Sequence, residues 1–168
     1  MASDEQSQRE LRLRVVVMGG ASDAFLGALE LTNGEMPLGL VHDFQASLVF
    51  ESYPTVDPWA GDGAQGKALE QAAHRLDVLV LTDALSEGAH YSSSAVERLC
   101  RLLHPARVVV PTVIFGGPAL AMEWQSLTGV APVMVCDPTP ENAKAAARAA
   151  AKAGLRALRR SEPPPSVR

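Results

Sequence analysis

Carboxylates and a serine–histidine segment are the groups in this 168-residue chain whose types could do chemistry. Asp83 and Asp137 each follow an apolar run, and paired carboxylates at the carboxyl ends of strands could hold a cation. His42 precedes Asp43, and residues 90–94 place a histidine near three serines. Loop caps, a hairpin turn and a helix start account for these groups, and no glycine elbow surrounds the serines. The sequence therefore indicates no catalytic set.

The glycine pair Gly19-Gly20 lies between an apolar run and the helix-start residues Ser22-Asp23. A strand, a glycine turn and a helix N-terminus together have the shape of a phosphate-binding loop. In the motif G-x-x-x-x-G-K-S/T counted from Gly19, the lysine and hydroxyl positions fall on Phe25 and Leu26. Asp23 also places a negative charge where a phosphate would lie. The sequence therefore predicts the backbone shape of a phosphate-binding loop without the lysine and hydroxyl side chains that bind phosphate and magnesium.

Composition indicates one soluble globular domain, with 47% hydrophobic and 20% charged residues. No apolar run approaches the roughly 20 residues of a membrane helix, and the polar N-terminus indicates no export signal. Cys100 and Cys136 form no metal or redox motif, and we expect buried thiols in a reducing cytoplasm. From Thr139 onward, seven Lys or Arg and two Glu give +5, so the preceding 138 residues carry −9 of the total −4.

Apolar periodicity and turn residues predict alternating strands and helices that position these groups. The expected strands are 11–19, two strands of a hairpin within 38–53 around Asp43, 77–81, 107–115 and 132–136. The expected helices are 22–31, 65–75, 94–103 opened by a capping box at Ser94 and Glu97, 119–127, and 139–158. This order predicts a three-layer α/β domain over 11–158, with a mostly parallel six-stranded sheet and one antiparallel edge strand. Residues 1–10 and 159–168 are expected to be disordered tails.

Over about residues 14–158 the chain resembles the Ras-like small GTPases. RVVVMGG is similar to their first strand and loop entrance, and GLVHDFQASLVFES to the hairpin that follows switch I. LDVLVLTDALSEGAHYSSSAVERLCRLL, VVVPTVIFGG and APVMVCDPT are similar to the later strands with their following loops or helix. The match concerns element order and hydrophobic spacing, and it implies a small-GTPase-like P-loop fold.

The signature residues of that family are replaced. Residues 52–56 are SYPTV where the family has DxxG, and residues 116–119 are GGPA where NKxD would read guanine. The loop 136–138 is CDP in place of the SAK-like motif. The resemblance therefore implies a pseudo-GTPase without nucleotide, metal or other cofactor. We expect Ser22 or Asp23 to cap the helix amides and Phe25 to fill the nucleotide volume.

Two features indicate a partner surface. Tyr53 and Trp59 lie in a proline-rich loop at the switch II position, which is the effector surface of small GTPases. Alternatively, Trp59 folds back to cover the first helix. Lys144, Arg148 and Lys152 recur every fourth residue of the last helix, followed by Arg156, Arg159 and Arg160. This row suits a solvated face, an acidic partner or an anionic lipid surface, whereas the acidic body disfavours nucleic acid.

Three functions remain open from the sequence. The first is a non-catalytic cytoplasmic adaptor or scaffold subunit that binds another protein, such as a small GTPase, its regulator or a scaffold. The second is a small-molecule binder or enzyme that uses Asp83, Gly116 and Asp137 at the carboxyl edge of the sheet. The third is a structural subunit that forms a homo-oligomer. Alanine- and arginine-rich usage favours a bacterial source.

Overall fold

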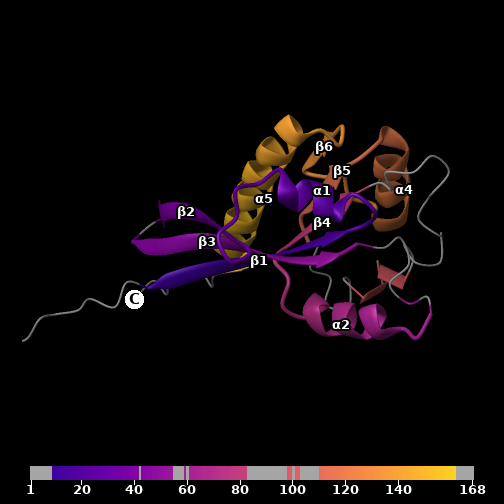
Figure 1. Cartoon of the computed structure of the whole chain (residues 1–168), viewed down its shortest axis with the longest axis horizontal. Helices are drawn as coiled ribbons and strands as arrows, with labels where there is room; N and C mark the ends of the chain where they lie inside the picture. The colour runs from indigo at the N-terminus through magenta and orange to yellow at the C-terminus, as the bar shows by residue number, and fades with distance from the viewer. Residues whose placement is uncertain are drawn as a thin grey trace, which may run out of the picture.

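The computed structural model describes residues 9–41, 43–54, 59, 61–82, 98–99, 101–102 and 110–161, with side chains as far as Leu158. Figure 1 shows the strands crossing the middle of the molecule, with α5 on one side of them and α2 on the other. The elements, in chain order, are β1 Glu10–Met18, α1 Ser22–Gly27, β2 Glu35–Val41, β3 Phe44–Tyr53, α2 Ala64–Ala73, β4 Val78–Thr82, β5 Thr112–Phe115, α4 Pro118–Thr128, β6 Met134–Cys136 and α5 Pro140–Ser161.

A six-stranded sheet in the order β2-β3-β1-β4-β5-β6 forms the middle layer. β1 pairs in parallel with β3 and β4, and β4, β5 and β6 continue the parallel arrangement. β2 pairs antiparallel with β3 and forms an edge. This confirms the prediction of an α/β domain whose mostly parallel sheet has one antiparallel edge strand.

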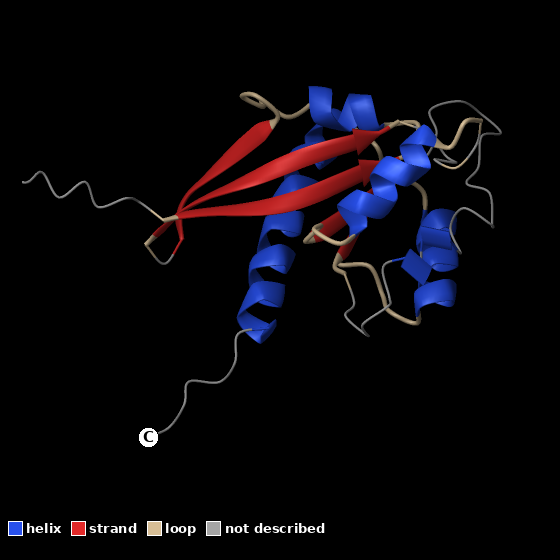
Figure 2. Ribbon diagram, turned by 90° about the horizontal axis from the view of Figure 1, so that it is seen from below, coloured by secondary structure: helices blue, strands red, loops and turns tan. Residues whose placement is uncertain are grey.

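Helices cover both faces of the sheet, and each face has its own apolar core. Because side chains alternate along a strand, Leu13, Val15 and Val17 of β1 face one side while Val16 and Met18 face the other. α1 and α5 pack on the first side, and α2 and α4 pack on the second. In Figure 2, α5 lies behind the sheet and α2 crosses in front of it. Both faces of β1 are therefore buried, as its unbroken apolar run predicts.

α5 packs close to the sheet because its inner face carries only small residues. The buried positions are Ala143, Ala146, Ala147, Ala150 and Ala151. At Gly154 an added Cβ would lie 3.1 Å from Cγ2 of Val78, so this turn approaches β4 more closely still. The helix begins as predicted, since the Thr139 hydroxyl accepts a hydrogen bond of 3.3 Å from the backbone N–H of Asn142.

The hairpin between β2 and β3 is also as predicted. Val41 pairs with Phe44, so the turn contains two residues, and Asp43 has a left-handed φ of 68° that aspartate tolerates. The outer strand contains Pro37, which lacks an N–H, and its register shifts between Pro37 and Gly39. Both features weaken this edge as a template for pairing with another chain.

Three predicted helices or strands differ from the structure or extend beyond what it describes. The first helix ends at Gly27, four residues before the predicted end at 31. Residues 98, 99, 101 and 102 are helical, whereas the capping box at Ser94 and Glu97 is outside the described residues. Of the predicted strand 107–115, the described strand is β5, which follows Pro111.

Candidate functional site: the loop after β1

The turn that joins β1 to α1 is held by its own hydrogen bonds. Gly19 has a φ of 117°, a conformation that favours glycine, and its N–H donates to the carbonyl of Tyr53 at 3.0 Å. The N–H of Ser22 donates to the carbonyl of Gly19 at 3.2 Å, and the Ser22 hydroxyl donates to the same oxygen at 2.7 Å. The chain therefore closes a tight turn between Gly19 and Ser22.

Thr82, the last residue of β4, ties this turn to the neighbouring strand. Its hydroxyl accepts a hydrogen bond of 3.2 Å from the N–H of Ala21 and donates one of 3.0 Å to the carbonyl of Met18. Ala21 and Thr82 are both fully buried. An amide that already donates to a protein oxygen has no free N–H for a phosphate. The N–H groups of Gly19, Ala21 and Ser22 are therefore occupied within the protein.

The predicted capping of α1 by Ser22 or Asp23 is wrong. Ala21 occupies the N-cap position and makes no side-chain cap hydrogen bond. Ser22 is the first helical residue, and its hydroxyl donates backwards to a carbonyl instead of accepting from the helix amides. Asp23 is exposed in the first turn. The Thr82 hydroxyl and the Gly19 carbonyl accept instead from the amides of Ala21 and Ser22, which precede the amides that a helix cap satisfies.

Phe25 occupies the position of the phosphate-binding lysine in the motif, and it is completely buried. Its ring meets the ring of Phe115 at a centroid distance of 4.9 Å and an angle of 71°, and that of Phe50 at 6.3 Å and 63°. These edge-to-face contacts belong to the core shared by α1, α5 and the sheet, and Leu26 packs at its margin. The position therefore serves the core, where a lysine ammonium would be desolvated.

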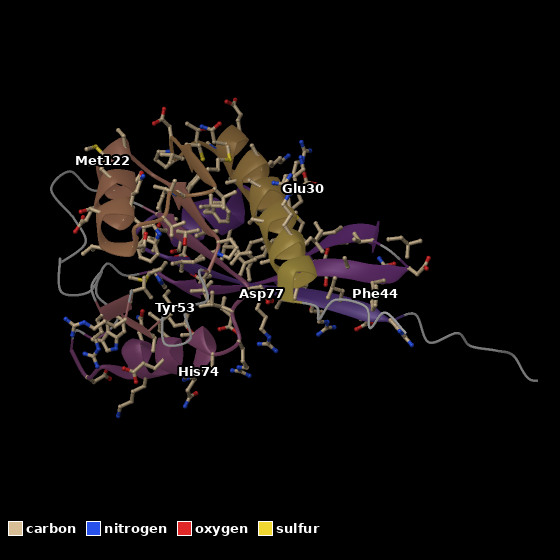
Figure 3. All side chains as sticks on the ribbon, turned by 180° about the vertical axis from the view of Figure 1, so that it is seen from behind. Glu30, Phe44, Tyr53, His74, Asp77 and Met122 are labelled. Atoms are coloured by element: carbon tan, nitrogen blue, oxygen red, sulfur yellow. The ribbon has the colours of Figure 1, made fainter. Side chains whose placement is uncertain are left out.

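Tyr53 is not on the surface, contrary to our expectation for a partner contact. It is 8% exposed and belongs to the core beneath α2, and Figure 3 shows it beside that helix. Its hydroxyl donates to Oε2 of Glu51 at 3.5 Å. Burial and then the nearby Glu51 carboxylate raise the pKa of Tyr53. The residue ends β3 on the face that α2 covers, and this explains its burial.

Trp59 lies on α2 rather than on the first helix. Its indole Nε1–H donates to Oε1 of Glu70 at 3.1 Å, and the guanidinium carbon of Arg98 lies 4.7 Å from the indole centroid. Arg98 also pairs with Glu70 at 3.2 Å. Gly66 makes room for the indole, since an added Cβ would lie 2.8 Å from Cγ and Nε1 of Trp59. We call this group, Trp59, Gly66, Glu70 and Arg98, the tryptophan cluster.

The other sequence candidates do not form a site within the part of the chain that the structure describes. Asp83, His42 and residues 90–94 are outside it. Gly116 is buried, and its N–H donates to the carbonyl of Cys136 at 2.9 Å, so this amide is not free for a ligand. Asp137 is exposed, and its carbonyl accepts hydrogen bonds from the following helix start. Among the described residues, no group of three His, Cys, Asp or Glu could hold a metal ion.

In the turn after β1, the sequence reasoning missed Thr82. Its signal was a single hydroxyl at the end of the otherwise apolar segment VLVLT.

On α5, Lys144, Arg148 and Lys152 are exposed, as their spacing predicts.

Comparison of the sequence with protein-family models and with curated proteins found no match. None of the helices in the described part of the chain has the length and apolar character needed to cross a membrane.

Proposed function

We propose that this protein is a non-catalytic pseudo-GTPase that does not bind GTP and acts as a protein-interaction adaptor or scaffold subunit. The element order and the antiparallel edge strand β2 agree with what the resemblance to small GTPases implies, and this supports the proposal. The family's phosphate, magnesium and guanine motifs are replaced in the sequence, as described above.

One observation carries the proposal. Three amides of the turn after β1 already donate within the protein, since Ala21 donates to Thr82, Ser22 to Gly19, and Gly19 to Tyr53. In a nucleotide-binding loop these N–H groups would face phosphate oxygens. Binding a nucleotide here would first require these buried hydrogen bonds to break. The burial of Phe25 adds to this cost, because α1 is anchored in the core by its ring.

The tryptophan cluster supports an interaction role. Tryptophan and arginine are the residue types that most often dominate the energy of protein interfaces. Trp59 is half-buried and fixed by Glu70 and Arg98, while Arg98 remains exposed. A partner would therefore meet a pre-organised aromatic and cationic pair, which reduces the ordering cost of binding.

The test of the proposal is a titration with fluorescent GDP and GTP analogues in the presence of magnesium. We expect no saturable signal up to roughly 1 mM nucleotide, a limit that corresponds to a binding free energy weaker than about −4 kcal/mol. A nucleotide-binding small GTPase in the same assay serves as the positive control. A micromolar dissociation constant, or stoichiometric guanine nucleotide released from the purified protein, would refute the proposal.

The interaction surface has its own matched test. Arg98→Glu changes the tryptophan cluster, whereas Arg75→Glu makes the same charge change at an exposed residue just after α2. For a direct protein partner, we expect Arg98→Glu to abolish binding and Arg75→Glu to leave it unchanged. Equal partner binding by wild type and both variants would show that the tryptophan cluster is not part of the interface.

A further inference from the structure

A row of cations runs along the outer face of α5. Lys144, Arg148, Lys152 and Arg156 recur every fourth residue, and all four are exposed. A rise of 1.5 Å per residue places successive cations about 6 Å apart along the axis and spans about 18 Å from the first to the last. The row turns by about 40° around the helix at each step, because four residues exceed one helical turn. We call these four residues the basic row.

The basic row lacks carboxylate partners within the described structure. None of its four members forms an ion pair there, whereas Arg12, Arg14 and Arg98 each pair with a glutamate. Like charges four residues apart repel and destabilise a helix slightly. A cation early in the helix, at Lys144, also opposes the helix dipole. Helix stability therefore does not explain the row.

α5 packs on the domain through its inner face, and the four cations of the basic row take no part in this packing. The buried alanines and Gly154 contact the core on the side of α1. No large apolar side chain of α5 is among the exposed ones in the described structure. As far as its side chains are described, the outer face thus has no group that could enter a lipid bilayer, and its attraction is electrostatic alone.

Exposed acidic residues lie on α5 and on the elements next to it. Glu141 is exposed one turn before Lys144. α1 packs beside α5, and Asp23 of α1 and Glu30 just after it are exposed, with Glu30 beside α5 in Figure 3. Asp137 is exposed where β6 leads into α5. A broad anionic surface, such as a membrane or a nucleic-acid duplex, would bring negative charge against these carboxylates as well.

We propose that the basic row binds an acidic α-helix of a partner protein. In a helix with Asp or Glu at every fourth position, successive carboxylates are also about 6 Å apart along the axis and are rotated by about 40° around it. Such a ligand is narrow enough to follow the row between the flanking carboxylates. The exposed Ala145 beside the row lets the partner approach closely. This inference rests on the proposed function, since it names the chemistry of the partner of the adaptor.

The probe is a fluorescein-labelled peptide of alanine and glutamine with glutamate at every fourth position, matched to α5 in length. The control peptide has the same composition with glutamate at every fifth position, which spreads the charges around the helix. Binding to the full chain is followed by fluorescence anisotropy at low salt and at about 0.15 M salt, where the Debye length is about 8 Å. We expect saturable binding that weakens with salt, and weaker binding of the control peptide.

Two double variants carry the same change in net charge. Arg148→Glu with Lys152→Glu reverses half of the basic row, and Lys67→Glu with Arg75→Glu reverses two exposed cations in and after α2. We expect the first pair to weaken peptide binding by roughly tenfold or more and the second by less than about twofold. Circular dichroism of each variant checks that the fold is retained.

Four results would overturn the inference. They are no binding by the wild type at low salt, equal binding of the two peptides, equal losses in the two double variants, and tighter binding of phosphatidylserine vesicles or duplex DNA through the same row. The nucleotide titration reports on the proposed function separately. Nucleotide binding would refute the pseudo-GTPase proposal whatever the peptide result, and failure of peptide binding would leave the nucleotide result unchanged.

Discussion

Replacing Thr82 by valine removes the hydroxyl that closes the turn after β1 while keeping the shape of the side chain. In the native protein this hydroxyl accepts from the Ala21 N–H at 3.2 Å and donates to the Met18 carbonyl at 3.0 Å. Both Thr82 and Ala21 are fully buried. Water therefore has no access to the amide that loses its acceptor.

The expected loss of stability follows from the unpaired amide. A buried donor without a partner costs about 1–3 kcal/mol, and valine introduces no cavity because it matches threonine in volume. For a domain of this size each kcal/mol lowers the melting temperature by about 2–4 °C. Thr82→Ser keeps the hydroxyl and loses one methyl group, at a cost of about 0.8 kcal/mol.

Chemical denaturation gives the two stabilities, and amide hydrogen exchange separates their causes. We expect Thr82→Val to accelerate exchange at Ala21 selectively, and Thr82→Ser to retain its protection. Native stability together with unchanged protection at Ala21 in Thr82→Val would refute the role of this hydroxyl. Faster exchange in the serine variant to the same extent would refute it as well.

Four further substitutions test packing and electrostatics elsewhere in the domain. Gly66→Ala should displace the indole of Trp59, because the added Cβ would lie 2.8 Å from its Cγ and Nε1, and a shifted indole N–H resonance would show this. Gly27→Ala should raise the free energy of unfolding by about 0.5–1 kcal/mol, because the new Cβ would meet no atom within 4 Å beyond its chain neighbours and its own helix backbone. Gly154→Val should lower the free energy of unfolding by about 1–3 kcal/mol, because an added Cβ there already lies 3.1 Å from Val78. Burial raises the pKa of Asp77 even though a backbone N–H on β1 donates to its carboxylate. Because the folded pKa exceeds the unfolded one, ionisation disfavours folding, and this cost appears as pH rises through the folded pKa. The stability of Asp77→Asn relative to wild type should therefore increase from roughly pH 3 to pH 7 in denaturation curves, and a constant difference would contradict the shift.

The sequence predicts the sheet well because unbroken runs of apolar residues indicate strands that are buried on both faces. The run VVVM in β1 and the segment VLVLT of β4 are buried on both faces, and this is the signature of central parallel strands. The residues Thr139-Pro140-Glu141 locate the start of α5, and its alanine spacing locates the inner face. These features are local, so a single sequence suffices to find them.

The site was harder to predict because its contacts join distant parts of the chain. Thr82 meets Ala21 across 61 positions, and nothing near either residue indicates the pairing. Trp59 depends on Gly66 for space and on Arg98 for its cationic neighbour, and Arg98 comes from another helical segment. Only the packing of the elements reveals such contacts.

Tyr53 and α1 show how local patterns mislead. Tyr53 directly precedes a proline-rich segment, and for this reason we expected it on an exposed loop, but it is the last residue of β3. α2 covers the end of β3, so Tyr53 is buried while Glu51 remains half-exposed. In α1 the apolar spacing continues beyond Gly27, but Leu29 reaches the core from a turn rather than from a helix.

The central claim is that the amides of Gly19, Ala21 and Ser22 in the turn after β1 donate within the protein and are therefore not free for a nucleotide. The most direct measurement is a two-dimensional amide NMR titration of the protein with GDP and magnesium, read at Gly19, Ala21 and Ser22. The account predicts that these three resonances do not move and that their exchange protection is unchanged. Saturable shifts confined to these amides would show that the turn opens to a phosphate and would contradict the account.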